Sequence, residues 1–204
     1  EGFPDAAIVA SNDLDEHLIA DLKRQGAAIG VWGVGTKLVT GHDQPALGGV
    51  YKLNALREPG GRWEPRVKLS EQAVKTSNPG LLQVRRFSDA SGAVADAIYD
   101  ELVPLGSAPT IIDPLDPLRR RRLDAGLASR DLLVPIFRGG ERIYSPPPLA
   151  AVRDHAQAEL AQFHAGIRRF SNPHSYPVGL ESSLFELKSR LVLSARSGEE
   201  APRS

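Results

Sequence analysis

The chain has 204 residues, of which 41% are hydrophobic and 25% charged, and its formal net charge is +0. This balance excludes a disordered chain and provides no overall field that would attract nucleic acid or an anionic membrane. Cysteine is absent, which excludes disulfides and agrees with a reducing compartment, and no apolar run is long enough to span a membrane. Methionine is also absent and the first residues do not resemble a signal peptide, so we expect a piece that begins inside a longer protein.

The first part of the chain predicts a strand–helix–strand unit. Ala6–Ala10 and Ala27–Trp32 are short apolar runs, typical of buried strands. Between them, Asp13 begins a capping-box pattern and Gly26 is a stop signal at the end of the helix. The short connections favour parallel strands joined by a right-handed crossover, which brings both strand C-termini to the same edge of the sheet.

Two polar loops follow these strands and are the candidate binding site. The first loop contains Ser11, Asn12 and Asp13, and the second contains Gly33, Val34, Gly35 and Thr36. Two glycines allow close approach of the backbone, and successive N–H groups of such a turn can point at an anion. We predict a phosphate held by the loops rather than on the helix axis, where acidic side chains would compete for the N–H groups. An ordinary strand-to-helix turn without a ligand is the alternative.

The pattern of hydrophobic and polar residues changes near Val50. Short, partly alternating segments separated by glycine and proline turns predict an antiparallel sheet with one solvated face. The predicted strands are Val50–Leu53, Arg66–Ser70, Leu82–Phe87 and Ala93–Tyr99. Leu102–Asp131 reads as a proline-interrupted connector that carries Arg119–Arg122; the neighbouring aspartates favour a solvated segment over a nucleic-acid site.

The last third of the chain predicts a hairpin and two helices. Arg138-Gly139-Gly140 has the composition of a hairpin turn. Apolar residues at steps of three or four predict one long helix over Leu149–Phe170. A final helix is marked by Leu180, Leu184, Leu187 and Leu191.

Searches for catalytic and metal-binding patterns find none that is complete. His155 and His164 are nine residues apart on one predicted helix and so on opposite faces, which excludes a shared metal site. A nucleophile elbow, a Walker motif and a dinucleotide fingerprint are absent from the sequence. The chain therefore carries no recognisable catalytic apparatus of its own.

An ordered series of short segments resembles the C-terminal part of nicotinate phosphoribosyltransferase. The series runs through Ile8–Glu16, Gly33–Thr36, Gly49–Leu53, Lys68-Leu69-Ser70, Lys75-Thr76, Pro79-Gly80 and Asn172–Leu180. It covers nearly the whole chain in order, and Glu181 stands where the resemblance predicts a serine. The resemblance implies an α/β chain in two parts. Residues 1–49 would be the last βα units of an irregular type II phosphoribosyltransferase barrel, and residues 50–204 an α+β sandwich-type portion of antiparallel sheet and helices.

The resemblance also implies an activity for the complete protein. The family forms nicotinate mononucleotide from nicotinate and phosphoribosyl pyrophosphate in NAD salvage, with coupled ATP hydrolysis and Mg²⁺. It implies a cytoplasmic homodimer whose partners are small molecules, not nucleic acid or membrane. The two loops match those that hold the ribose 5′-phosphate, so Ser11, Asn12, Gly33, Gly35 and Thr36 are the main candidates.

Several family segments are missing from the chain. These are the acidic segment associated with phosphoribosyl pyrophosphate and Mg²⁺, the aromatic residues that stack on nicotinate, and the histidine that couples ATP. The catalytic residues are therefore expected upstream of Glu1, and this chain alone is expected to bind neither metal nor ATP. Two rival interpretations stay open, namely a non-catalytic phosphate-binding or interaction module and a structural remnant with empty loops. The roles of Lys68, Ser70, Lys75 and His174 stay open as well.

Overall fold

The computed structural model describes residues 2–198 and divides the chain into two compact units, one up to Tyr51 and one from Lys52 onward. The second unit contains a six-stranded mixed sheet with helices, so the fold is mixed α/β. Among the helices in the described part, none has both the length and the apolar content needed to cross a bilayer.

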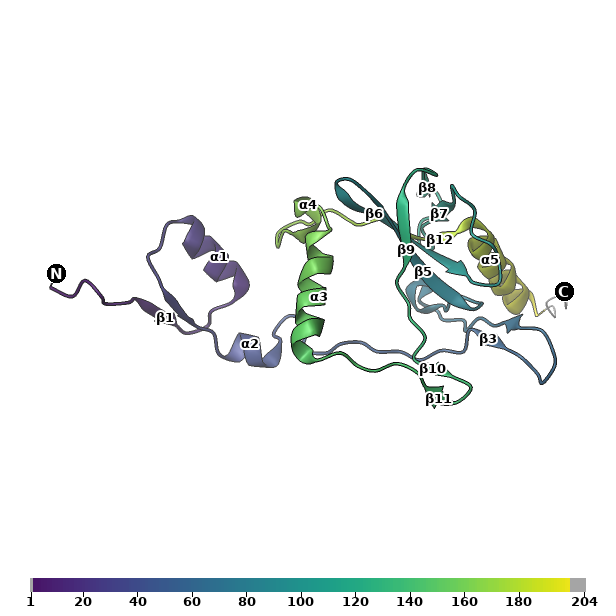
Figure 1. The fold of residues 1–204 in the computed structure, drawn as a ribbon, viewed down its shortest axis with the longest axis horizontal. Coiled ribbons are helices and arrows are strands. Elements are labelled where there is room, and N and C mark those ends of the chain that lie inside the picture. The colour runs from purple at the N-terminus through teal and green to yellow at the C-terminus, as the bar shows by residue number, and fades with distance from the viewer. Residues whose placement is uncertain (1, 199–204) are drawn as a thin grey trace. The chain divides into compact units, whose positions relative to one another are not determined.

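The first unit is the predicted strand–helix–strand arrangement. It consists of β1 (Val9–Ser11), α1 (Glu16–Arg24), β2 (Val31–Gly33) and the short α2 (Thr36–Thr40) (Figure 1). The strands β1 and β2 are parallel, as predicted, and Ser11 pairs with Gly33 at their C-terminal ends. Both strands begin later than the apolar runs that predicted them.

The residue that caps α1 differs from the prediction. Asp15 is the N-cap, with an extended backbone and a carboxylate that accepts a hydrogen bond from the Leu18 N–H at 2.7 Å. Asp13 has a φ of 49° and Asn12 a φ of 81°, both in the left-handed region that asparagine and aspartate tolerate. An N-cap requires an extended backbone, so the capping box predicted at Asp13 is wrong.

The second unit is built on β5 (Leu82–Asp89) and β6 (Gly92–Asp100), the predicted antiparallel hairpin. The sheet order is β8-β7-β12-β6-β5-β9. The predicted connector contains three of these strands, namely β7 (Thr110–Ile112), β8 (Arg120–Arg122) and β9 (Ala128–Asp131). The connector prediction for residues 102–131 is therefore wrong. The sheet is also mixed rather than antiparallel, because β12 (Val178–Glu181) pairs with β6 in parallel.

Two further strand predictions are wrong. Val50–Leu53 and Arg66–Ser70 contain no strand; the chain there forms the two-residue strands β3 (Ala55–Leu56) and β4 (Glu64–Pro65) and a 3₁₀ turn at Ala73–Lys75. The predicted hairpin turn at Gly139-Gly140 is confirmed, with β10 (Phe137–Arg138) and β11 (Glu141–Arg142) on either side of it.

The predicted long helix is interrupted. Helix α3 (Leu149–Ala161) ends at Gln162, and the chain restarts as the short α4 (Ala165–Arg168) with His164 as its N-cap. The carbonyl of Gln162 accepts a hydrogen bond from Ala93 N–H of the β5–β6 hairpin at 2.9 Å. A contact from a distant part of the chain therefore fixes the backbone where the local pattern predicts continued helix.

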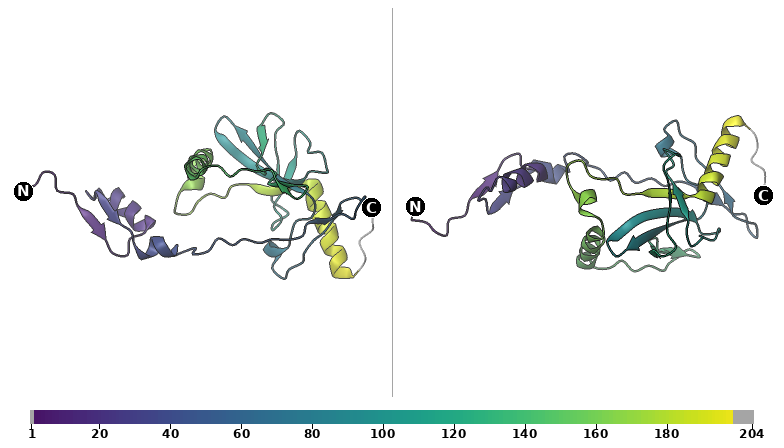
Figure 2. Two further views of the ribbon diagram at one scale, coloured as in Figure 1. Left: turned by 60° about the horizontal axis from the view of Figure 1, so that its bottom comes forward. Right: turned by 90° about the horizontal axis from the view of Figure 1, so that it is seen from above.

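The core of the second unit lies on the sheet. Alternation along the paired strands places Phe87, Ala95, Ala97 and Ile111 on one face, where they cluster with Leu123. Helix α5 (Ser182–Ser197) contacts β6, β7 and β12 (Figure 1), and its start lies next to β12 in the two further views (Figure 2). Leu180, predicted to be helical, is the buried centre of β12, and Leu184 is buried on α5.

Candidate functional site

The two predicted loops lie side by side at the C-terminal edge of the β1–β2 pair. The pairing of Ser11 with Gly33 fixes this arrangement, because each residue is the last of its strand. A Cβ atom added to Gly33 would lie 3.2 Å from the Ser11 Cβ, so the two backbones approach too closely for a larger side chain to fit without a shift. All seven predicted residues therefore belong to one pair of adjacent loops.

The space in front of Gly35 is open. A Cβ added there would meet no heavy atom within 4 Å among the described residues. Gly35 is the N-cap of α2 and has no side chain with which to cap the first-turn N–H groups. This loop can therefore offer backbone N–H donors and the Thr36 hydroxyl to a ligand.

The start of α1 is already occupied by a carboxylate. Asp15 caps the helix and also accepts a hydrogen bond from Lys37 Nζ at 2.5 Å. These hydrogen bonds, first that of Lys37 and then that of the Leu18 N–H, lower the pKa of Asp15, and the same contact raises the pKa of Lys37. An anion at the α1 N-terminus would meet a negative side chain, so an anion-binding role falls to the second loop.

Lys37 is a residue that the sequence analysis did not single out. Its ion pair links the first turn of α2 to the first turn of α1 and so ties the elements that follow the two loops. The spacing of 22 residues between Lys37 and Asp15 gives no local signal of the contact. Only the βαβ topology brings the two residues together.

A cavity of about 520 Å³ lies beside these helices, but its lining is poorly suited to an anion. Val34 lines it from the predicted loops, together with Lys37 and the acidic residues Asp15, Glu16 and Asp43. Three carboxylates against one ammonium group disfavour a phosphate in this cavity. The open side of Gly35 is a better place for an anion.

One group of side chains in the described part of the chain lies close enough together to hold a metal ion. Ligand atoms of Glu16, His17 and Asp43 lie within 4.8 Å of one another, and all three residues are exposed. Mg²⁺ prefers oxygen ligands in octahedral geometry and is usually held with substrate phosphates, whereas this set includes an imidazole. The group does not fit the magnesium implied by the family resemblance.

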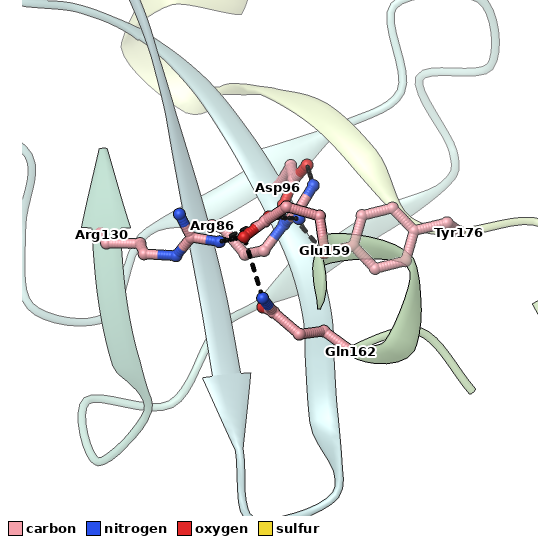
Figure 3. Close-up of polar contacts among 6 residues, drawn as sticks. All are labelled: Arg86, Asp96, Arg130, Glu159, Gln162 and Tyr176. Atoms are coloured by element: carbon pink, nitrogen blue, oxygen red, sulfur yellow. Dashed lines mark hydrogen bonds and ion pairs between the residues drawn. The ribbon is translucent and has the colours of Figure 1, made fainter. Parts of the chain in front are cut away.

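The second unit contains a polar network that the sequence analysis missed (Figure 3). Arg86 donates two hydrogen bonds of 2.9 Å to Asp96 and one of 3.0 Å to Glu159 on α3. Arg130 and Gln162 also donate to Glu159, at distances between 2.6 and 3.0 Å. Arg130, Arg86 and Asp96 stand opposite one another on β9, β5 and β6, so the sheet register creates the row of charges.

Tyr176 completes this network from the segment before β12. Its hydroxyl donates to Asp96 at 2.8 Å, and burial and this hydrogen bond raise the pKa of Tyr176. The Phe163 ring packs edge-on against Tyr176 at 4.8 Å and lies 4.7 Å from the Arg86 guanidinium. The network holds the C-terminal end of α3 against the sheet, and each charged group in it has a partner.

The other residues whose roles were left open have local structural contacts. The Lys68 N–H donates to Ser77 Oγ at 2.7 Å, and Ser70 Oγ accepts from the Gln72 N–H at 3.3 Å. The Lys75 carbonyl accepts from Lys52 Nζ, and the His174 N–H donates to the Gly166 carbonyl at 2.9 Å. These contacts stabilise loops; the role of each side chain in the complete protein stays open.

Comparison with known proteins gives the family of the chain. Residues 83–188 match the family described as nicotinate phosphoribosyltransferase C-terminal domain. Nicotinate phosphoribosyltransferase of Bacillus subtilis (strain 168) is 36% identical over 200 residues, which cover 96% of this chain and 40% of that protein. The human protein of the same name is 32% identical over 186 residues, covering 90% and 34%.

A solved structure agrees with the fold. The crystal structure of human nicotinic acid phosphoribosyltransferase superposes with a TM-score of 0.62 at 24% identity, covering 92% of this chain and 33% of that one. The chain belongs to the nicotinate phosphoribosyltransferase family, as the resemblance indicated. It spans about a third to two fifths of the length of the relatives it matches.

Proposed function

We propose that this chain is the C-terminal part of an enzyme that forms nicotinate mononucleotide from nicotinate and phosphoribosyl pyrophosphate with coupled ATP hydrolysis. Its two adjacent loops would hold the ribose 5′-phosphate. The observation that carries this proposal is the parallel pairing of β1 with β2, which ends at Ser11 and Gly33 and brings the loops together. Ligands of α/β sheets and barrels bind at this edge, at the C-termini of the strands.

The chemistry of the loops suits a phosphate that is positioned and not transformed. Backbone N–H groups and the hydroxyls of Ser11 and Thr36 donate hydrogen bonds without carrying a proton to or from the reacting atoms. Gly33 keeps the two backbones close, and Gly35 leaves space in front of the second loop. Such a cradle fixes the sugar while the bond from its anomeric carbon to pyrophosphate breaks, which is a contribution of orientation.

The electrostatic arrangement supports the same assignment. Asp15 satisfies the start of α1 and is neutralised by Lys37, so the Asp15 carboxylate does not oppose an anion at the second loop with an unpaired charge. The remaining parts of the reaction belong to groups outside this chain. In this proposal β1 and β2 are the last strands of an α/β barrel, the complete enzyme works as a cytoplasmic homodimer, and Mg²⁺ and ATP bind to residues upstream.

A pair of matched substitutions in the complete enzyme tests the role of the loops. Gly35→Val fills the open space in front of the second loop, whereas Gly30→Val adds the same side chain at another open position on the approach to β2. We expect Gly35→Val to raise the KM for phosphoribosyl pyrophosphate by about tenfold or more, and Gly30→Val to change it by less than about twofold. An unchanged KM in Gly35→Val would show that the loop does not touch this substrate.

A further inference from the structure

A second pocket, separate from the loops of the proposed function, lies in the unit that begins at Lys52. It has a volume of about 390 Å³, within the range of small-molecule sites. Its lining includes Arg119, Arg120 and Arg121 at the edge of the sheet, and Ser175 and Tyr176 before β12. The pocket lies where β7 ends and β8 and β12 begin.

Two arginines of this pocket have no carboxylate partner within residues 2–198. Arg120 donates through Nε to the Pro117 carbonyl at 2.9 Å, and Arg121 through Nη1 to the Val94 carbonyl at 3.3 Å. Each of these bonds uses one of the five N–H donors of a guanidinium group and neutralises no charge. Arg120 and Arg121 therefore line the cavity without a carboxylate partner among the described residues.

The acidic residues near the pocket are engaged elsewhere. Asp116 forms an ion pair with Arg119 at 3.0 Å. Asp113, which lines the pocket, accepts hydrogen bonds through Oδ1 from the N–H groups of Leu115 at 2.8 Å and of residue 116 at 3.3 Å. The Asp113 carboxylate thus stabilises the turn that it begins. Three arginines and two aspartates, Asp113 and Asp116, leave a net positive charge at the pocket.

Tyr176, which lines the pocket, is held in place by contacts with the rest of the second unit. The Tyr176 hydroxyl is bonded to buried Asp96, and its ring packs on Phe163, as part of the network in Figure 3. Ser175 beside it is exposed and has no hydrogen-bond partner in the part of the chain that the structure describes. The pocket is therefore lined by a serine hydroxyl, a tyrosine that is held in place and two arginines that have unused N–H donors.

We propose that this pocket binds a phosphate group, either as inorganic phosphate or as part of a small phosphorylated molecule. Guanidinium groups bind phosphate through paired N–H donors, and this geometry gives both strength and selectivity over spherical anions. The Ser175 hydroxyl adds a further donor to the lining. The volume of about 390 Å³ favours a small molecule over a nucleic-acid strand.

Amide NMR of the 204-residue chain tests the proposal with local resolution. The probes are inorganic phosphate and glycerol 3-phosphate, with glycerol and equal ionic strength of chloride as controls. We expect saturable shifts of the Ile111, Ser175 and Gly179 amides with phosphate at millimolar concentration or below. Tighter binding of glycerol 3-phosphate than of phosphate would identify an organic phosphate as the ligand, and the reverse would identify the free ion.

Matched arginine variants separate this site from general charge effects. Arg120→Gln combined with Arg121→Gln should weaken binding at these amides at least tenfold. Arg122→Gln, on the same strand but not lining the pocket, should change it less than twofold. Unchanged amide shifts of β5 and β6 would verify that the variants are folded.

Three results would overturn the proposal. The first is shifts at the pocket no larger than those caused by chloride. The second is equal weakening by Arg122→Gln and by the double variant. The third is phosphate-dependent shifts confined to the loops at residues 11–13 and 33–36, which would support the proposed function but leave this pocket without a ligand.

Discussion

Replacing Arg86 by methionine should destabilise the second unit more than replacing any exposed charged residue of that unit. The Arg86 side chain is 10% exposed and that of Asp96 9% exposed, and the two are joined by two hydrogen bonds of 2.9 Å. Methionine preserves much of the packing against Phe163 but leaves Asp96 charged and buried, and among the described residues only the Tyr176 hydroxyl still donates to it. Removing one partner of such a pair costs about 3–5 kcal/mol of unfolding free energy.

Arg85→Met is the matched control on the next residue. Arg85 also forms a two-bond ion pair, with Asp131 at 2.7 Å, but the side chains are 29% and 36% exposed. Water can solvate Asp131 when its partner is removed, so we expect a loss of about 1 kcal/mol or less. Comparing neighbouring positions on opposite faces of β5 isolates the effect of burial.

A double variant tests the stated cause of the loss. Asp96→Asn in the Arg86→Met background removes the buried charge and keeps an acceptor for the Tyr176 hydroxyl, so about 1–2 kcal/mol should return. Hydrogen exchange of the slowest β5 and β6 amides measures the opening free energy of this unit in each variant. Equal losses in Arg86→Met and Arg85→Met, or no recovery in the double variant, would refute the reasoning.

Three further outcomes are expected. Burial raises the pKa of Glu159, but the hydrogen bonds, led by that of Arg130, prevail and hold this pKa below its ordinary value of 4.5. The stability that ionised Glu159 contributes is therefore complete above pH 4.5 and is lost as the pH falls through the lowered pKa. Acid-unfolding curves of Glu159→Gln should lack this loss. Gly92→Ala should cost at least about 2 kcal/mol in urea unfolding, because φ is +122° and the new Cβ would lie 2.2 Å from the Gln162 carbonyl oxygen, while Gly106→Ala, with open space, should cost little; equal midpoints would contradict this. The 204-residue chain alone should form no nicotinate mononucleotide in a product assay with all substrates and Mg²⁺, and turnover of about 1 per second or more would show that the essential groups are present in it.

The sequence predicted the parts of the fold whose signals are local. The β1–α1–β2 order follows from two apolar runs and one helical pattern, and the β5–β6 hairpin from alternation around Ser91-Gly92. The family resemblance covered nearly the whole chain, since it rests on the order of many short segments. These are the cases in which neighbouring residues specify the structure by themselves.

The missed elements depend on partners far along the chain. The strands β8 and β9 are mostly polar and exposed, so no hydrophobic alternation marks them, and they exist because β7 and β5 offer edges for pairing. The break after α3 depends on the hydrogen bond from Ala93, which lies 69 residues away from Gln162 in sequence. Single-sequence patterns contain no information about such pairings.

The candidate site divides in the same way. The seven loop residues could be named from the strand-end glycines and the polar residues that follow, and the parallel pairing then brought them together. Neither the Lys37–Asp15 ion pair nor the choice of Asp15 over Asp13 as the helix cap could be predicted, because each depends on backbone conformation and crossover geometry. What the loops bind stays a prediction.

A crystal structure of the complete enzyme with nicotinate mononucleotide bound would test the central claim most directly. The account predicts the ribose 5′-phosphate on the open side of Gly35, with its oxygens about 2.7–3.2 Å from backbone N–H groups of the second loop and a hydroxyl of Ser11 or Thr36 within the same range. A 5′-phosphate bound elsewhere, with these loops empty, would contradict it.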